Sequence, residues 1–262
     1  MPTNELLTER RGQSLIVTFN RPTLANSFTM DMANQMFLVL KNATTDRSVR
    51  AILLCGAANN FLGGLDECFY KGDMDTLLER ANQLILPYHS VVRELQVMDK
   101  PVLAAVEGQV SGPGLSFMLA SDLVIAAEST KICFASTRFG MSPDGAVSYF
   151  LTRKAGAGRA AQMMMLSEEI DGKTAQDYGI VNRVVPDARL HDEALAFLDR
   201  LTEGPTRAYG CIKKLVQHAP DHDLGTHLGL EHTFVGHSAR SFDFREAVKS
   251  LAAGKVPKFT GT

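Results

Sequence analysis

Two glycine-containing turns are the parts of this 262-residue chain best suited to chemistry. The first is Phe61–Asp66, shortly after the apolar run Ala51–Cys55, and the second is Gly108–Leu115, after the apolar run Val102–Val106. Glycine lets a backbone approach a ligand closely, and a turn that opens into a helix presents free N–H groups. Two such groups converging on one point would form an oxyanion hole, which stabilises an enolate formed from a thioester. Each turn taken alone is equally compatible with an ordinary helix start.

Buried strands and crossover helices must position these turns. Strand-like runs alternate with helical spacing in the first half, which favours mainly parallel pairing. The expected strands there are Ser14–Phe19, Ala51–Cys55, Val102–Val106 and Leu123–Ala126. The expected helices are Thr29–Asn42 with Thr29 as N-cap, Met74–Gln96 with Pro87 as a candidate break, and one beginning at Leu115–Leu119.

The spacing becomes almost entirely helical from about Gly156. The expected helices are Ala160–Leu166, Thr174–Tyr178, Leu190–Leu201, Pro205–His218 and Leu228–Ala252, with Ile180–Val185 as the only strand candidate. No Ser/Gly-rich linker separates the two parts. We therefore expect one continuous globule, with a core over residues 1–195 and a C-terminal helical region over residues 196–262.

Bulk composition excludes several classes of protein. The formal net charge of −2 gives no global basic field for nucleic acid or an anionic membrane. The four cysteines form no CxxC pair, the charged N-terminus lacks the apolar core of a signal peptide, and the apolar runs are too short to span a bilayer. A cytoplasmic protein with no nucleic-acid or membrane partner is the default expectation.

The remaining sequence signals give no metal or dinucleotide site. None of the seven histidines has HExxH or similar ligand spacing, and Pro220 between His218 and His222 disrupts a shared helix face. The second turn is not GxGxxG, and no serine lies in a GxSxG elbow. We expect no metal and no separate cofactor.

An ordered set of motifs resembles the enoyl-CoA hydratase/isomerase (crotonase) superfamily. Each motif is weak alone, but together they run in order from about residue 5 to residue 261. They are Asn20–Phe28 ("NRP…NAL"), Phe61–Asp66 ("FxAGxDL"), Lys100–Gly108 ("KPVIAAVNG"), Gly112–Asp122 (the second turn and its helix), Asp171–Val185, and Phe244–Ala247 with Pro257–Gly261.

The resemblance implies a fold and a ligand. The fold is α/β, the crotonase (ClpP-like) spiral of ββα units with a C-terminal helical region that makes homotrimers or paired trimers. The ligand is an acyl-thioester of coenzyme A, whose oxygen would lie between the N–H groups at Gly63 and at position 113. The other implied substrate or CoA contacts are Arg21, Leu24, Ala25, Leu62, Gly64, Leu65, Asp66, Gly112 and, from a neighbouring subunit, Lys258 and Phe259.

The resemblance also bears on the reaction. Hydratases of this family use two glutamates, and the matching positions are Ser116 and Arg138, which argues against ordinary hydratase activity. Phe139–Gly145 instead resembles the segment that carries the lone acid of single-acid isomerases, which makes Asp144 the candidate catalytic carboxylate. Read without the family, Ser-Pro-Asp-Gly is a strong turn sequence.

Position 113 departs from the family because proline has no N–H to donate. Losing one oxyanion donor typically lowers the rate roughly 100- to 1,000-fold. Pro113 can simply start the helix. Alternatively, it leaves the oxyanion hole weakened, or the hole is completed by Gly114 or by a water. A register slip of one residue would also remove the conflict.

The sequence therefore favours an acyl-CoA isomerase that shifts a double bond by single-acid proton transfer. Its motifs most resemble those of phenylacetate-pathway ring-epoxide isomerases and of Δ3,Δ2-enoyl-CoA isomerases. The resemblance suggests a role in phenylacetate catabolism or fatty acid metabolism. The alternatives are an acyl-CoA-binding homologue with little or no activity, or a hydratase, hydrolase, dehalogenase or decarboxylase of the same fold.

Overall fold

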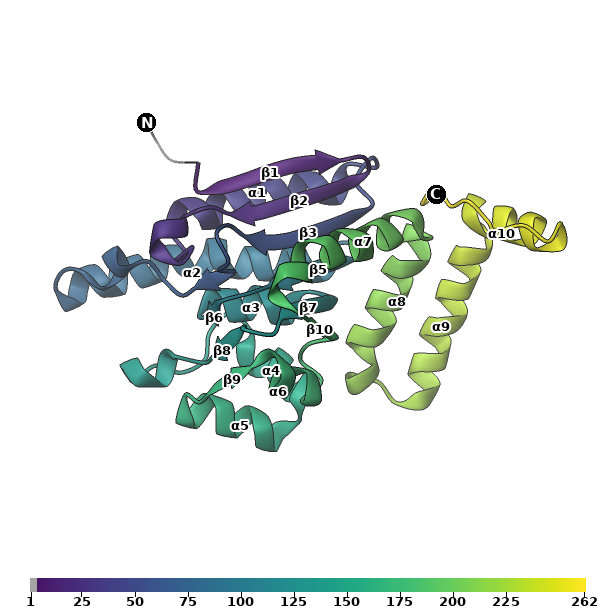
Figure 1. Ribbon diagram of the computed structural model, residues 1–262. Coiled ribbons are helices and arrows are strands. Elements are labelled where there is room, and N and C mark those ends of the chain that lie inside the picture. The colour runs from purple at the N-terminus through teal and green to yellow at the C-terminus, as the bar shows by residue number, and fades with distance from the viewer. Residues whose placement is uncertain (1–3) are drawn as a thin grey trace.

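A six-stranded sheet forms the centre of the molecule (Figure 1), in a computed structural model that describes residues 4–262. Its strand order is β1-β2-β3-β5-β7-β10, and every neighbouring pair is parallel except β1 with β2. The strands are β1 (Leu6–Arg11), β2 (Ser14–Phe19), β3 (Ala51–Gly56), β5 (Val102–Val106), β7 (Leu123–Ala127) and β10 (Arg183–Val185). Strands β3 and β5 have helices on both faces, which explains their continuous apolar runs.

A smaller sheet of short strands lies beside the first. Its order is β4 (Leu62–Gly63), β6 (Gln109–Ser111), β8 (Lys131–Cys133) and β9 (Glu169–Asp171). Strands β4, β6 and β8 follow β3, β5 and β7 along the chain and pair in parallel. The chain therefore passes repeatedly from one sheet to the other, which confirms the expected α/β spiral.

The helices follow local sequence signals closely. They are α1 (Met30–Thr45), α2 (Met74–Val97), α3 (Pro113–Ala120), α4 (Val147–Ala155), α5 (Ala157–Leu166), α6 (Gly172–Asp177), α7 (Leu190–Glu203), α8 (Thr206–His218), α9 (Leu224–Ala239) and α10 (Phe242–Ala252). Thr29 caps α1 as expected, since its hydroxyl accepts a hydrogen bond from the Met32 N–H at 3.1 Å. Helix α2 runs through Pro87 without ending, so the candidate break there is wrong.

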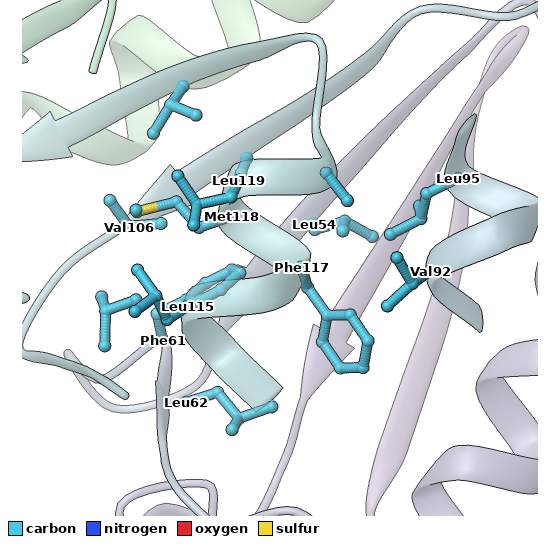
Figure 2. Close-up of a cluster of buried hydrophobic side chains, with 14 of the residues drawn as sticks. Leu54, Phe61, Leu62, Val92, Leu95, Val106, Leu115, Phe117, Met118 and Leu119 are labelled. Atoms are coloured by element: carbon cyan, nitrogen blue, oxygen red, sulfur yellow. The ribbon is translucent and has the colours of Figure 1, made fainter. Parts of the chain in front are cut away.

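Helix α3 is the centre of the main core (Figure 2). All eight of its residues are buried, and the Phe117 ring packs among Leu54, Val92 and Leu95. The helix lies so close to β4 that a side chain at Gly114 would collide with the Leu62 carbonyl. This tight packing fixes the position of the helix start, where the second turn lies.

The C-terminal region differs from the expected single helix over Leu228–Ala252. The structure has two helices, α9 and α10, because Ser241 starts a new helix and its hydroxyl accepts a bond from the Phe244 N–H at 3.0 Å. Strand β9 was also not expected, since its three residues carry little pattern. Helices α9 and α10 project away from the sheets as an arm (Figure 1), and no residue of α9 is buried.

Candidate functional site

The two glycine turns meet side by side. Strands β4 and β6 pair in register, with Gly63 opposite Ser111, so both turns leave the small sheet at the same edge. Gly112 has a φ of +52°, and a Cβ placed on it would lie 3.3 Å from the Gly64 Cα and 3.8 Å from the Leu65 nitrogen. Glycine at 112 therefore permits both the positive φ and the close approach of the two backbones.

The free N–H of the first turn belongs to Leu65 rather than to Gly63. The Gly63 N–H donates to the Ala25 carbonyl at 2.9 Å, so the donor expected at Gly63 is already used. On both sides of Leu65 the chain bonds to Phe28, which donates to the Gly64 carbonyl and accepts from the Asp66 N–H. Because successive peptide groups of a strand alternate in direction, the Leu65 N–H points away from Phe28, on the side of Gly112. The hydrogen bonds found among residues 4–262 give this N–H no acceptor.

The second turn leads directly into the amino end of α3. Pro113 is the first residue of the helix and has no N–H. The first helical N–H is that of Gly114, which, like others in a first helical turn, has no partner within the helix. The second turn therefore offers the Gly114 N–H, which lies at the positive end of the buried helix α3.

The first turn is tied to the loop that precedes α1 by an ion pair. Arg21 Nη2 lies 2.6 Å from Asp66 Oδ2 and its Nε lies 3.1 Å from Glu5 Oε1. Burial opposes ionisation of Asp66, but the hydrogen bond from the Cys68 N–H and the Arg21 guanidinium hold its pKa below the ordinary value. Arg21 and Asp66, expected as ligand contacts, are here mutual partners that fix the turn.

Asn26 holds the same loop from the inside. Its side chain is fully buried, accepts from the Arg21 N–H at 2.7 Å and donates to the carbonyls of Ala57 and Asn60. Next to it Ala25 has a φ of +49° and Leu24 is 46% exposed, so Leu24 is available to a ligand. The sequence motif contained Asn26, but nothing in it assigned this clamping role.

A neutral hydroxyl pair stands at Ser116, the position that the resemblance matches to a glutamate of the hydratases. Ser116 of α3 is fully buried, and its hydroxyl shares a short hydrogen bond with the Tyr88 phenol of α2. Burial raises the pKa of Tyr88 above its ordinary value, so the phenol stays protonated at neutral pH. A side chain at Gly145, whose φ is +59°, would collide with both oxygens. The backbone at Gly145, directly after Asp144, therefore packs against the Ser116 and Tyr88 hydroxyls.

Asp144 and His89 face each other in contact. Asp144 Oδ1 lies 2.5 Å from His89 Nε2, and the side chains are 44% and 49% exposed. The Asp144 carboxylate also accepts from the Gly145 N–H at 2.6 Å. Gly145, directly after Asp144, packs on Ser116 of α3, the helix whose first turn contains Gly114. No sequence pattern assigned a role to His89, because its partner Asp144 is 55 residues away along the chain.

Four other residues that the resemblance singled out lie outside this cluster or are buried in the core. Arg138 Nη2 donates to the Ser167 carbonyl at 2.9 Å, so it is occupied elsewhere. Lys258 is exposed, and the carbonyl of Phe259 accepts from Arg50 at 3.0 Å, at the C-terminal end of the chain. Leu62 is fully buried in the core. Within one chain, the site is formed by the two turns, Asp144 and His89.

The histidines on either side of Pro220 do not share a helix face, as expected, because α8 ends at His218. The rings of His218 and His222 stack with centroids 5.3 Å apart despite Pro220. Even so, over residues 4–262 no group of three or more His, Cys, Asp or Glu side chains is arranged to hold a metal ion. Nor does any helix in that part of the chain combine the length and apolar character needed to cross a membrane.

Comparisons with known proteins show which proteins this chain resembles. The chain is 34% identical to 1,2-epoxyphenylacetyl-CoA isomerase of Escherichia coli (strain K12), over 94% of this chain and 95% of the relative. It is 28% identical to 4-chlorobenzoyl coenzyme A dehalogenase-2 of an Arthrobacter species, over 79% and 76%. A crystal structure of an enoyl-CoA hydratase from Polaromonas sp. JS666 superposes with a TM-score of 0.92 at 26% identity, over 97% and 99%.

The family model described as enoyl-CoA hydratase/isomerase matches residues 10–262, which is almost the whole chain. The spiral fold agrees with that match. This chain belongs to the enoyl-CoA hydratase/isomerase family and has the crotonase fold.

Proposed function

We propose that the protein is an acyl-CoA isomerase that shifts a double bond by proton transfer at Asp144. In a 3-enoyl-CoA, the carboxylate removes a proton from C2 and returns it at C4, and the electrons move through a dienolate on the thioester oxygen. The contact between Asp144 and His89, next to the two backbone turns, is the observation that carries this proposal. The isomerase class is supported by the relative named 1,2-epoxyphenylacetyl-CoA isomerase, and rearrangement of an epoxyphenylacetyl-CoA to an oxepin is the alternative reaction at the same carboxylate.

The dienolate oxygen would be held by the Leu65 and Gly114 N–H groups. Both belong to turns that lie side by side, and Gly114 is at the amino end of α3. Pro113 then starts the helix and is not itself a donor. Backbone donors aimed at a developing negative charge are among the largest contributions to this type of catalysis.

His89 would position the Asp144 carboxylate. A proton donor on a ring nitrogen, close to one carboxylate oxygen, leaves the other oxygen free to face the substrate. Ser116 and Tyr88 are both neutral hydroxyls, which leaves Asp144 as the carboxylate for the proton transfer at this place.

The proposal is tested by exchange of α-protons in deuterated water. The wild-type protein should exchange the C2 protons of 3-enoyl-CoA and of phenylacetyl-CoA, and should convert the former to 2-enoyl-CoA. Asp144→Asn should lose both activities roughly 100- to 10,000-fold and still bind acyl-CoA. Asp31→Asn, on the exposed start of α1, is the matched control. Full turnover by Asp144→Asn would refute the proposal.

A second candidate is hydrolytic dehalogenation of a haloaroyl-CoA, which the same His89–Asp144 contact favours. Asp144 would attack the ring carbon that bears the halogen, and halide would leave to give an aryl ester. His89 would then activate water to attack the ester carbonyl, which releases a hydroxyaroyl-CoA and restores the carboxylate. Halide release from 4-chlorobenzoyl-CoA, measured directly, separates this reaction from isomerisation.

We also propose that the arm of α9 and α10 packs on other copies of the chain to make a homotrimer. Apolar side chains remain exposed along the arm; they include Leu224, Leu228, Val235, Phe242, Phe244, Val248 and Leu251. Exposed apolar surface of this extent favours a protein partner. Lys258 and Phe259 would reach the CoA of a neighbouring subunit. Light scattering gives the mass directly, against 28.6 kDa for one chain.

A further inference from the structure

Two aromatic rings on separate loops stack beside the candidate site. Tyr70 ends the short helix η2 (Glu67–Tyr70) and Phe139 ends the short helix η3 (Ser136–Phe139). Their ring centroids are 5.2 Å apart and the rings are nearly parallel, at 14°. Tyr70 is nonetheless 43% exposed and Phe139 is 59% exposed. The stack therefore joins two loops and still leaves apolar ring surface open.

Each ring is attached to one half of the proposed reaction centre. Helix η2 begins directly after the Leu65–Asp66 part of the first turn, which carries the oxyanion donor. Helix η3 ends shortly before Asp144, which carries the carboxylate. An acyl group whose thioester oxygen lies at Leu65 and whose α-carbon faces Asp144 is thus flanked by two chain segments that meet at this stack.

Both supports of the stack are firmly held. On the η2 side, Asp66 accepts from the Cys68 N–H at 2.8 Å, and Arg80 Nη1 of α2 donates to the Cys68 carbonyl at 2.8 Å. On the η3 side, the Thr137 hydroxyl donates to the Met164 carbonyl at 3.0 Å, and Arg138 donates to Ser167. These hydrogen bonds hold the two backbone segments that carry the rings.

We infer that the stacked Tyr70–Phe139 pair is the end wall of the acyl site and selects planar aromatic acyl groups over long flexible chains. The inference rests on the proposed function, because it places the thioester between the first turn and Asp144. An aromatic acyl group can contact the ring surfaces and keep the stack closed. A long alkyl chain has to separate the two rings, and it loses their contact.

The test is a set of dissociation constants measured by calorimetry, with phenylacetyl-CoA and dodecanoyl-CoA as ligands. Phe139→Ala and Tyr70→Ala should each raise the dissociation constant of phenylacetyl-CoA roughly 2- to 10-fold, which corresponds to the loss of one aromatic contact. Both variants should lower the dissociation constant of dodecanoyl-CoA. Tyr70→Phe keeps the stack and should match the wild type. Met141→Ala, an exposed apolar residue close to Phe139 in sequence, is the control for loop damage.

Equal changes for both ligands, or no change for either, would overturn the end-wall assignment. The outcome is separate from that of the proposed reaction, because affinities need no turnover. If the wild-type protein exchanges no α-protons but its ligand selectivity is lost in Phe139→Ala, the isomerase is refuted and the wall is kept. Exchange activity with a selectivity that Phe139→Ala leaves unchanged refutes the wall and keeps the isomerase.

Discussion

His89 Nε2 lies 2.5 Å from Asp144 Oδ1, although 55 residues separate the two side chains along the chain. The contact joins α2 to the segment before α4. Directly beside it, Tyr88 of α2 bonds Ser116 of α3. Consecutive residues of one helix therefore serve two purposes: Tyr88 anchors in the core, and His89 reaches the half-exposed carboxylate.

Replacing His89 should weaken catalysis with little effect on stability. His89→Ala removes the hydrogen bond that holds the Asp144 carboxylate in position. We expect kcat/KM to fall roughly 10- to 100-fold, with partial recovery in His89→Gln, whose amide can still donate. Urea unfolding should be nearly unchanged because the ring is 49% exposed. A catalytic rate equal to that of the wild type would exclude a positioning role.

Gly145→Ala should disturb the packing of the segment that carries Asp144, and Gly140→Ala is its matched control. Both glycines have positive φ, +59° and +68°, so both variants carry the strain of that backbone region, about 1–2 kcal/mol. Only at Gly145 would the new Cβ collide with Tyr88 and Ser116, while Gly140 has open space around it. Overpacking adds about 1–3 kcal/mol. The free energy of unfolding should therefore be lower for Gly145→Ala than for Gly140→Ala. Equal values would contradict the packing of Gly145 on Tyr88 and Ser116.

The Arg21–Asp66 pair should give the protein a specific sensitivity to acid. The pKa of Asp66 is lower in the folded protein than its ordinary 3.8, so its contribution to stability is complete above about pH 4. That contribution disappears as the pH falls through the lowered folded value. Asp66→Asn should cost about 1–3 kcal/mol at pH 7, and the difference from the wild type should shrink toward pH 3.

Urea unfolding at pH 7, 5 and 3.5 measures this dependence. Asp199→Asn is the control, because its ion pair with Arg11 is exposed on both sides and should matter little. A difference between Asp66→Asn and the wild type that stays constant over this range would mean that ionisation of Asp66 does not stabilise the fold.

Pro113→Ala tests how the oxyanion site is completed. If Leu65 and Gly114 supply the donors, an added N–H at position 113 should change kcat less than about threefold. If the proline leaves the hole one donor short, the same variant should gain activity, by as much as about 100-fold. Steady-state kinetics with 3-enoyl-CoA distinguishes the two, and the helix should tolerate alanine at its first position.

Local sequence signals predicted the frame of the site well. Strand Ser14–Phe19 and the Thr29 cap were found with the correct residues, because alternation and capping act over a few neighbours. The identity of the first donor was not, since it depends on which of the Gly63 and Leu65 N–H groups already has an acceptor. That is set by pairing with Ala25 and Phe28, distant in sequence.

The His89–Asp144 contact could not be predicted for a similar reason. Helix periodicity places His89 on a face of α2, but it does not say which loop arrives beside that face. The break between α9 and α10 was missed because one serine cap interrupts an otherwise helical pattern. Chemistry that arises from contacts across the fold requires the topology as well as the residue types.

The strand order has a consequence for synthesis of the chain. Strand β7 pairs with β5 on one side and with β10 on the other, and β10 is made much later, at Arg183–Val185. Until β10 leaves the ribosome, the nascent chain exposes the apolar edge of β7, with its backbone groups unpaired. A shortage of chaperone, or a translational pause between residues 127 and 183, should therefore promote aggregation of the newly made protein before its site is complete.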